Sequence, residues 1–108
     1  MANNISLTVR LPHTLNTQLQ AAAKALGMTK TNLLRSAIHD FLTVENVVLD
    51  FSATSDTKDR LVLNINQMTH TILENACRKH SQSMNAIITA VGFLALERST
   101  TWLQSIRP

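Results

Sequence analysis

The sequence repeats itself at an interval of 54 residues, and this repeat restricts the possible folds more than any other feature of the chain. A shift of 54 positions, without a gap, lays apolar residues of one copy on apolar residues of the other. The clearest pairs are Leu7 and Leu61, Val9 and Leu63, Leu11 and Ile65, Leu19 and Leu73, Leu33 and Ile87, and Leu34 and Ile88. The match fails at Leu15 and Thr69, at Gly27 and Ser81, and at Ile38 and Gly92. The copies have therefore diverged, and their surfaces need not do the same work.

The first copy has the pattern of a strand followed by two helices. Residues 5–11 alternate strictly between apolar and polar, which is typical of a half-buried strand. Pro12 ends this alternation, and apolar residues then recur at helical spacing, which predicts a helix over about 13–26 that Gly27 terminates. Thr29 is suited to be the N-cap of a second helix, whose apolar stripe continues to Leu42.

The second copy repeats this order more loosely. Its strand places Leu61, Leu63 and Ile65 on the inner face, a helix is expected from about Met68 to His80, and Ser83 is expected to cap the last helix. The last helix, over 84–96, is apolar on nearly every side, which is typical of a helix buried on more than one face. Either it forms the centre of the core, or its extra face meets another chain.

Two copies are needed to make one fold, because a single strand cannot form a sheet and one strand with two helices encloses too small a core. The predicted organisation is a first copy over 1–42, a linker over 43–59, a second copy over 60–98 and a C-terminal tail over 99–108. A flexible linker of this length spans about 23 Å, enough to let the two copies pair within one chain. The predicted fold class is therefore mainly α, with a small sheet built from one strand of each copy.

Charge is distributed unevenly along the chain. The linker holds Glu45, Asp50, Asp56 and Asp59 against Lys58, and the rest of the chain has nine basic and three acidic residues. A basic excess outside the linker suits a polyanionic partner.

Several classes of protein are excluded or disfavoured. The longest nearly unbroken apolar run, Ala86–Leu96, is too short for a bilayer span, so no membrane partner is expected. The start of the chain lacks a secretory pattern, and the single cysteine allows no internal disulfide; both favour a cytoplasmic location. Cys77 and His80 lie three residues apart on a helix, but no other ligand has metal-site spacing, so neither a metal nor another cofactor is expected. No phosphate loop, acid pair or nucleophile–base pattern predicts an enzyme.

The strand, the two helices and the Gly-Met-Thr-Lys-Thr-Asn turn at 27–32 resemble the ribbon-helix-helix DNA-binding family of the Arc and MetJ type. The resemblance covers about 5–42 well and 60–96 more loosely, and the tandem arrangement resembles the TraY-type accessory proteins of conjugative DNA processing. It implies a mainly α fold with a two-stranded antiparallel β-ribbon, formed as an intramolecular pseudo-dimer. The ribbon would enter the major groove of double-stranded DNA, in a transcriptional repressor or a relaxosome accessory factor.

The resemblance also implies which residues contact DNA. The outward side chains of the two strands would read bases; these are Ser6, Thr8, Arg10, Arg60, Val62 and Asn64. Residues at the start of each second helix would contact phosphates; these are Thr29, Lys30, Thr31, Asn32, Ser83 and Asn85. The alternatives to DNA contact are that the outward strand residues only form a solvated surface and that the residues at the helix starts only cap their helices.

Two other functions stay open. The chain could be an antitoxin that regulates its own operon and blocks a toxin, although only about ten residues follow the last expected helix, where such proteins carry a long toxin-binding arm. It could also be a purely structural helical module. Self-association on DNA through the apolar helix 84–96 is possible in the DNA-binding case.

Overall fold

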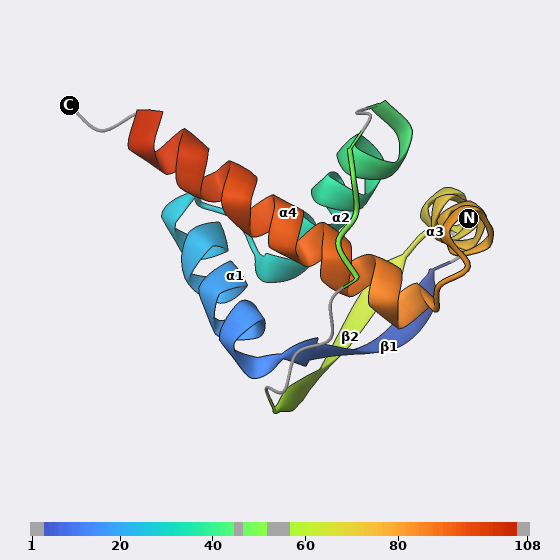
Figure 1. Ribbon diagram of the computed structural model, residues 1–108. Coiled ribbons are helices and arrows are strands. Elements are labelled where there is room, and N and C mark those ends of the chain that lie inside the picture. The colour runs from blue at the N-terminus through green and yellow to red at the C-terminus, as the bar shows by residue number, and fades with distance from the viewer. Residues whose placement is uncertain (1–3, 45–46, 52–56, 106–108) are drawn as a thin grey trace.

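The computed structural model describes residues 4–44, 47–51 and 57–105. In this part, the elements are β1 (Ile5–Pro12), α1 (His13–Ala25), α2 (Lys30–His39), the π-helical turn η1 (Asp40–Val44), β2 (Lys58–Ile65), α3 (Gln67–His80) and α4 (Met84–Ser105). The predicted class, mainly helical with a two-stranded antiparallel sheet, is confirmed. The two-stranded ribbon lies at one side of the molecule and the helices lie on its other side (Figure 1).

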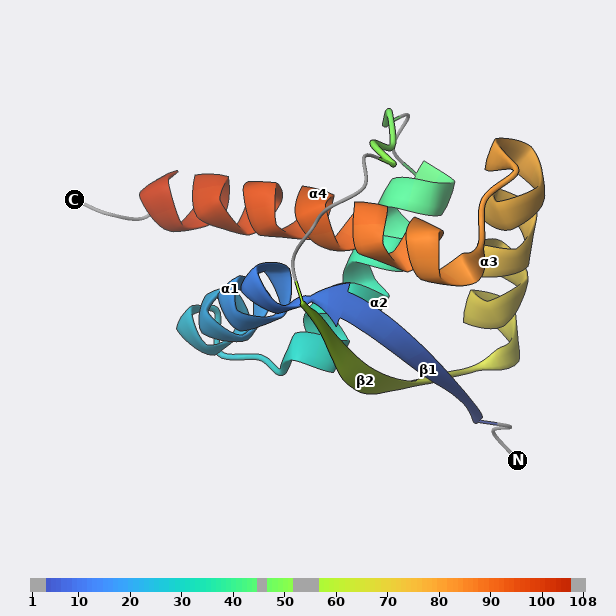
Figure 2. The ribbon, with the colours of Figure 1, turned by 60° about the horizontal axis from the view of Figure 1, so that its bottom comes forward.

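The two strands pair over their whole length in an antiparallel ladder (Figure 2). Ile5 lies opposite Ile65 and Arg10 opposite Arg60, so Thr8 lies opposite Val62. Val62 is also the residue that matches Thr8 in the 54-residue repeat. The ladder is thus centred on a pair of repeat-related residues.

The alternation of each strand puts its apolar residues on the face that meets the helices. Val9, Leu11, Leu63 and Ile65 are buried, as the alternation predicts. They join the helical stripes in one core, whose other fully buried large side chains are Leu15, Leu19, Leu33, Leu34, Ile38, Leu73, Ile87, Ile88 and Val91. Helix α4 contacts α1, α2, α3 and β1, so its nearly uniform apolarity reflects a central place in this core.

The two copies keep the same backbone conformation after their first helices, although the residue types there differ. Gly27 ends the turn after α1 with φ 74°, and Ser81, its counterpart after α3, has φ 54°. Thr29 accepts a hydrogen bond from the Asn32 amide, and Ser83 accepts one from the Ala86 amide, so both predicted N-caps are confirmed.

The helices differ from the predicted bounds mainly at their ends. The segment predicted as a tail continues α4 as far as Ser105, because it has packing partners: Ser99 is fully buried, and the Arg98 guanidinium lies 2.8 Å from an Asp40 carboxylate oxygen. Asn66, which the sequence analysis did not single out, caps α3 by accepting from the Thr69 amide, so α3 begins at Gln67.

The predicted linker is partly structured. Lys58 and Asp59 belong to β2, η1 extends α2 as far as Val44, and Leu49 is buried in the core with Phe51 packed against it. The linker acids Glu45 and Asp56 lie outside the described residues, as do residues 106–108 of the predicted tail.

Gly92 stands where the repeat would place an apolar side chain that matches Ile38, and it lies against α1. A Cβ at Gly92 would lie 3.3 Å from Leu15 Cδ2 and 3.5 Å from Leu19 Cδ1, so a methyl group would already fit tightly and a longer side chain would displace the α1 side chains. We expect Gly92→Leu to lower the free energy of unfolding by about 1–3 kcal/mol through overpacking. Urea denaturation checks this. Phe93→Leu, at the neighbouring exposed position, is the control, and an equal loss in both variants would contradict the close approach.

Candidate nucleic-acid interface

The outer face of the ribbon presents the six side chains that the family resemblance assigns to base contacts. All six are exposed, and no helix covers this face in Figure 1. The ladder arranges them in three cross-strand pairs, which are Ser6 with Asn64, Thr8 with Val62, and Arg10 with Arg60. The strand period brings these residues together because the alternate positions are held in the core.

Arg10 and Arg60 form an unfavourable pair. The Arg10 N–H and C=O both bond to the Asn85 side chain, at 2.7 and 3.0 Å, so Arg10 does not exchange backbone bonds with Arg60. In such non-hydrogen-bonded pairs the Cα atoms are only about 4.5 Å apart and the side chains are close. Like charges in this arrangement are destabilising. Neither guanidinium has an ion pair or hydrogen bond within the described ranges, so stability alone does not account for the pair.

The other end of the face is uncharged. The Ser6 hydroxyl donates to Asn64 Oδ1 at 2.8 Å, and Val62 beside them is about half exposed, at 48%. The face therefore changes from cationic to neutral and polar along the ribbon.

Helices α4 and α2 each bond to one edge of the ribbon. Asn85, in the first turn of α4, bonds to the backbone of β1 at Arg10. On the other edge, Arg35 of α2 donates from Nη1 to the Asn64 carbonyl of β2 at 2.7 Å, and from Nη2 to Asn32 Oδ1. Both edges of the ribbon are thus tied to a helix, β1 to the first turn of α4 and β2 to the middle of α2.

The side chains predicted to contact phosphate are mostly engaged within the protein. Thr29 and Ser83 are helix caps, Thr31 Oγ1 lies 3.3 Å from Thr29 Oγ1, and Asn32 and Asn85 are held by the bonds described above. The first backbone N–H groups of each helix have no acceptor within the helix, and the helix dipole has its positive end there. These groups can therefore attract an anion.

Lys30 belongs to a polar network at the Arg10–Arg60 end of the ribbon. Its ammonium donates to Asn16 Oδ1 at 2.6 Å, Asn16 donates to Asp59 Oδ2 at 2.9 Å, and His13 Nδ1 lies 2.8 Å from the same Asp59 oxygen. The network joins the starts of α1 and α2 to the start of β2. An ammonium has three donors, so the bond to Asn16 leaves Lys30 two more.

Sequence reasoning missed Arg35, Asn16 and His13 as parts of this region. Arg35 lies on α2 outside its apolar stripe, and its target is a backbone carbonyl that no sequence pattern marks. Asn16 and Asp59 are 43 residues apart, and only the fold brings them together.

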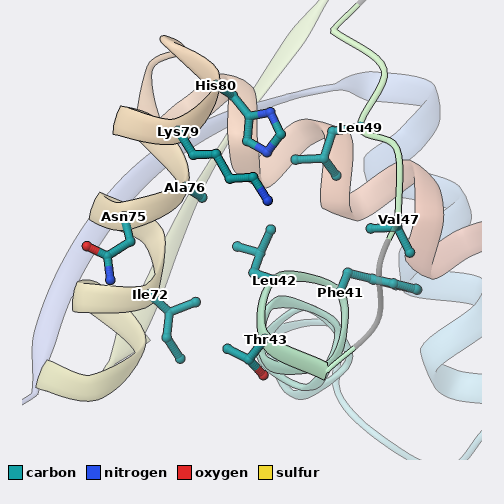
Figure 3. Close-up of a pocket in the computed structure, with 10 residues that line it drawn as sticks. All are labelled: Phe41, Leu42, Thr43, Val47, Leu49, Ile72, Asn75, Ala76, Lys79 and His80. Atoms are coloured by element: carbon teal, nitrogen blue, oxygen red, sulfur yellow. The ribbon is translucent and has the colours of Figure 1, made fainter.

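A small hollow lies away from the ribbon, between η1, residues 47–49 and α3 (Figure 3). It encloses about 180 Å³, and its wall is mixed: apolar side chains such as Phe41 and Ile72 line it together with polar ones, which are Thr43, Asn75, Lys79 and His80. Lys79 extends over it in Figure 3. Sites for small molecules usually measure about 300–1,000 Å³, so this hollow is small for one. The ribbon face is the stronger candidate.

Cys77 lies in α3 and is half-buried against the core. Among the described residues, no three His, Cys, Asp or Glu side chains gather closely enough to hold a metal ion. Burial, and after it the charge of Glu74, raises the pKa of the Cys77 thiol.

We therefore expect the alkylation rate of native Cys77 to reach half its maximum at a higher pH than that of a free cysteine, because only the thiolate reacts. Iodoacetamide kinetics between pH 7 and 11 measure the midpoint. Glu74→Gln should lower the midpoint by removing the negative charge. The same midpoint in native and urea-unfolded protein would contradict the raised pKa.

Comparison of the chain with protein-family models, with curated proteins and with solved structures gives no match. No helix in the described ranges is long and apolar enough to cross a membrane.

Proposed function

We propose that the protein binds double-stranded DNA in a sequence-specific manner, with the β1–β2 ribbon in the major groove. The observation that carries this proposal is the pair formed by Arg10 and Arg60, directly opposite one another on an uncovered strand face and without an acidic partner among the described residues. A bound duplex would offset the repulsion between the two guanidiniums, since guanine O6 and N7 accept hydrogen bonds from arginine.

The dimensions agree with this function. The major groove is about 12 Å wide and admits a two-stranded β-ribbon. The ribbon has only two strands, and its side chains on the outer face are long or polar at five of six positions. In a bound duplex, the first N–H groups of α2 and α4 would contact the phosphates that border the groove, because free N–H groups at a helix start attract anions.

The proposal includes the architecture that the family resemblance implies, a tandem ribbon-helix-helix unit that acts as a pseudo-dimer within one chain. Two features support it: the ladder centred on Thr8 and Val62, which the repeat relates, and the matching left-handed residues Gly27 and Ser81. A repressor and a relaxosome accessory factor would use the same interface, and the proposal covers both.

Fluorescence anisotropy with labelled duplexes tests the function. The full chain should bind a duplex selected from a random pool at least about 1,000-fold more tightly than unselected duplex, with affinity that falls as salt rises. Absence of salt-sensitive duplex binding would refute the proposal and favour a purely structural module.

Lys30 should contribute to affinity but not to sequence preference. We expect Lys30→Ala to weaken binding to all duplexes alike and to reduce the slope of log affinity against log salt by about one, because it removes one phosphate-directed charge. Salt titrations on the selected and an unrelated duplex measure both effects. Asn16→Ala, which removes the acceptor of Lys30 but no charge, is the control. If Asn16→Ala changes the slope equally, the charge of Lys30 does not act on DNA.

A further inference from the structure

The outer face of the ribbon has different side-chain chemistry at its two ends because of the way the two strands pair. Arg10 lies opposite Arg60 at one end, Ser6 lies opposite Asn64 at the other, and Thr8 and Val62 separate them. Residues of like chemistry are thus gathered at the same end.

This polarity arises from divergence of the repeat. In the 54-residue shift, Arg10 corresponds to Asn64 and Ser6 corresponds to Arg60. An antiparallel pair of identical copies would present the same two residues at each end. In this chain the substitutions in the second copy remove the symmetry, so the two ends of the face cannot make the same contacts.

The face is long enough to separate the two chemistries on DNA. Four residue steps separate the end pairs along each strand, about 13 Å at 3.3–3.4 Å per residue. The bases of one DNA strand follow each other at about 3.4 Å, so the face covers about four base pairs. The two ends therefore meet different base pairs.

Each end has a definite preference. Arginine pairs in bidentate fashion with guanine O6 and N7, and the two guanidiniums come from opposite strands of the ribbon, so that end suits two adjacent G·C pairs. Asparagine pairs with adenine N6 and N7. The bond from Ser6 occupies one lone pair of Asn64 Oδ1 and leaves the second lone pair and the amide N–H groups for a base. The methyl groups of Thr8 and Val62 suit thymine methyls between the ends.

We infer that one chain recognises a directional, non-palindromic subsite of about four base pairs, with two G·C pairs at the Arg10–Arg60 end and an A·T pair at the Ser6–Asn64 end. This inference rests on the proposed function, and it adds the class of DNA sequence that the ribbon takes.

Selection of bound duplexes from a random pool, followed by sequencing, gives the subsite of the full chain. The expected motif is G·C-rich at one end and A·T-containing at the other, also within each half of any paired site. Replacing either G·C pair should weaken binding about 5- to 150-fold. Asn64→Ala should lower the preference for A·T at the opposite end over a similar range and leave the G·C end unchanged.

The double variant Ser6→Arg/Arg60→Ser is the decisive comparison. It keeps the composition and net charge of the face but gives each end one arginine. Both positions are exposed, and circular dichroism verifies that the fold is retained. The expected result is a motif with G·C at both ends, closer to a palindrome than the motif of the parent chain.

The possible outcomes test the directional subsite and specific DNA binding separately. A selected motif that is palindromic within the subsite, or unchanged by the exchange, overturns the polarity and leaves specific DNA binding intact. Failure to enrich any duplex overturns both.

Discussion

Replacing both Arg10 and Arg60 by alanine is expected to weaken binding to the preferred duplex by about 2–6 kcal/mol, which is 1–3 kcal/mol for each bidentate contact to guanine. The same double variant should keep or slightly raise the free energy of unfolding, because it removes two like charges that lie opposite each other in the ladder. Anisotropy titration measures the first quantity and urea denaturation the second. A loss of binding without a loss of stability identifies side chains that serve a partner.

A matched control separates contact from net charge. Lys24 and Arg78 lie in the last turns of α1 and α3, each more than two helical turns from the strand that precedes the helix. Lys24→Ala/Arg78→Ala removes the same charge and should weaken the selected and unrelated duplexes alike, and only slightly. Equal effects of the two double variants on sequence preference would contradict the assignment of Arg10 and Arg60. A marked loss of stability in Arg10→Ala/Arg60→Ala would show that the arginines serve the fold.

Truncation of the core between α2 and α4 should have the largest effect on stability. We expect Leu34→Ala to lower the free energy of unfolding by about 2–5 kcal/mol, because Leu34 is fully buried and the side chains around it cannot collapse completely into the space it leaves. A domain of this size has a total stability of about 5–15 kcal/mol, so the loss should be visible as a lower urea midpoint with an unchanged slope.

The control for Leu34 is an apolar residue outside the core. Met68 is 67% exposed, and Met68→Ala should change the stability by no more than about 0.5 kcal/mol. Similar losses at Leu34 and Met68 would contradict the packing of α2 against α4.

The sequence predicted the elements whose residues repeat with a clear period. The alternation over 5–11 and the stripes through Leu19, Leu34 and Ile88 required only local geometry, and the shift of 54 residues predicted that the second strand would pair with the first. The six outward strand residues followed from the same alternation, once the inner face was assigned.

What the sequence did not predict depends on contacts between distant segments. The extension of α4 beyond residue 98 rests on Arg98, whose guanidinium lies 4.6 Å from the ring centres of both Phe41 and Trp102 and pairs with Asp40. The internal hydrogen bonds of Asn85 and Asn32, to which the family resemblance also assigns phosphate contacts, could not be predicted from their positions at helix starts. They depend on the register of the ribbon against the helices.

The bonds from Asn85 to β1 and from Arg35 to β2 also affect whether a strand of another molecule can add to this sheet. A two-stranded sheet has no interior strand, and each exposed edge is a template on which an extended segment of another molecule could grow into cross-molecular sheet. Asn85 occupies the N–H and C=O of Arg10 on one border, and Arg35 occupies the C=O of Asn64 on the other. These side chains interrupt the template on both borders, which keeps the sheet two strands wide and opposes aggregation by strand addition.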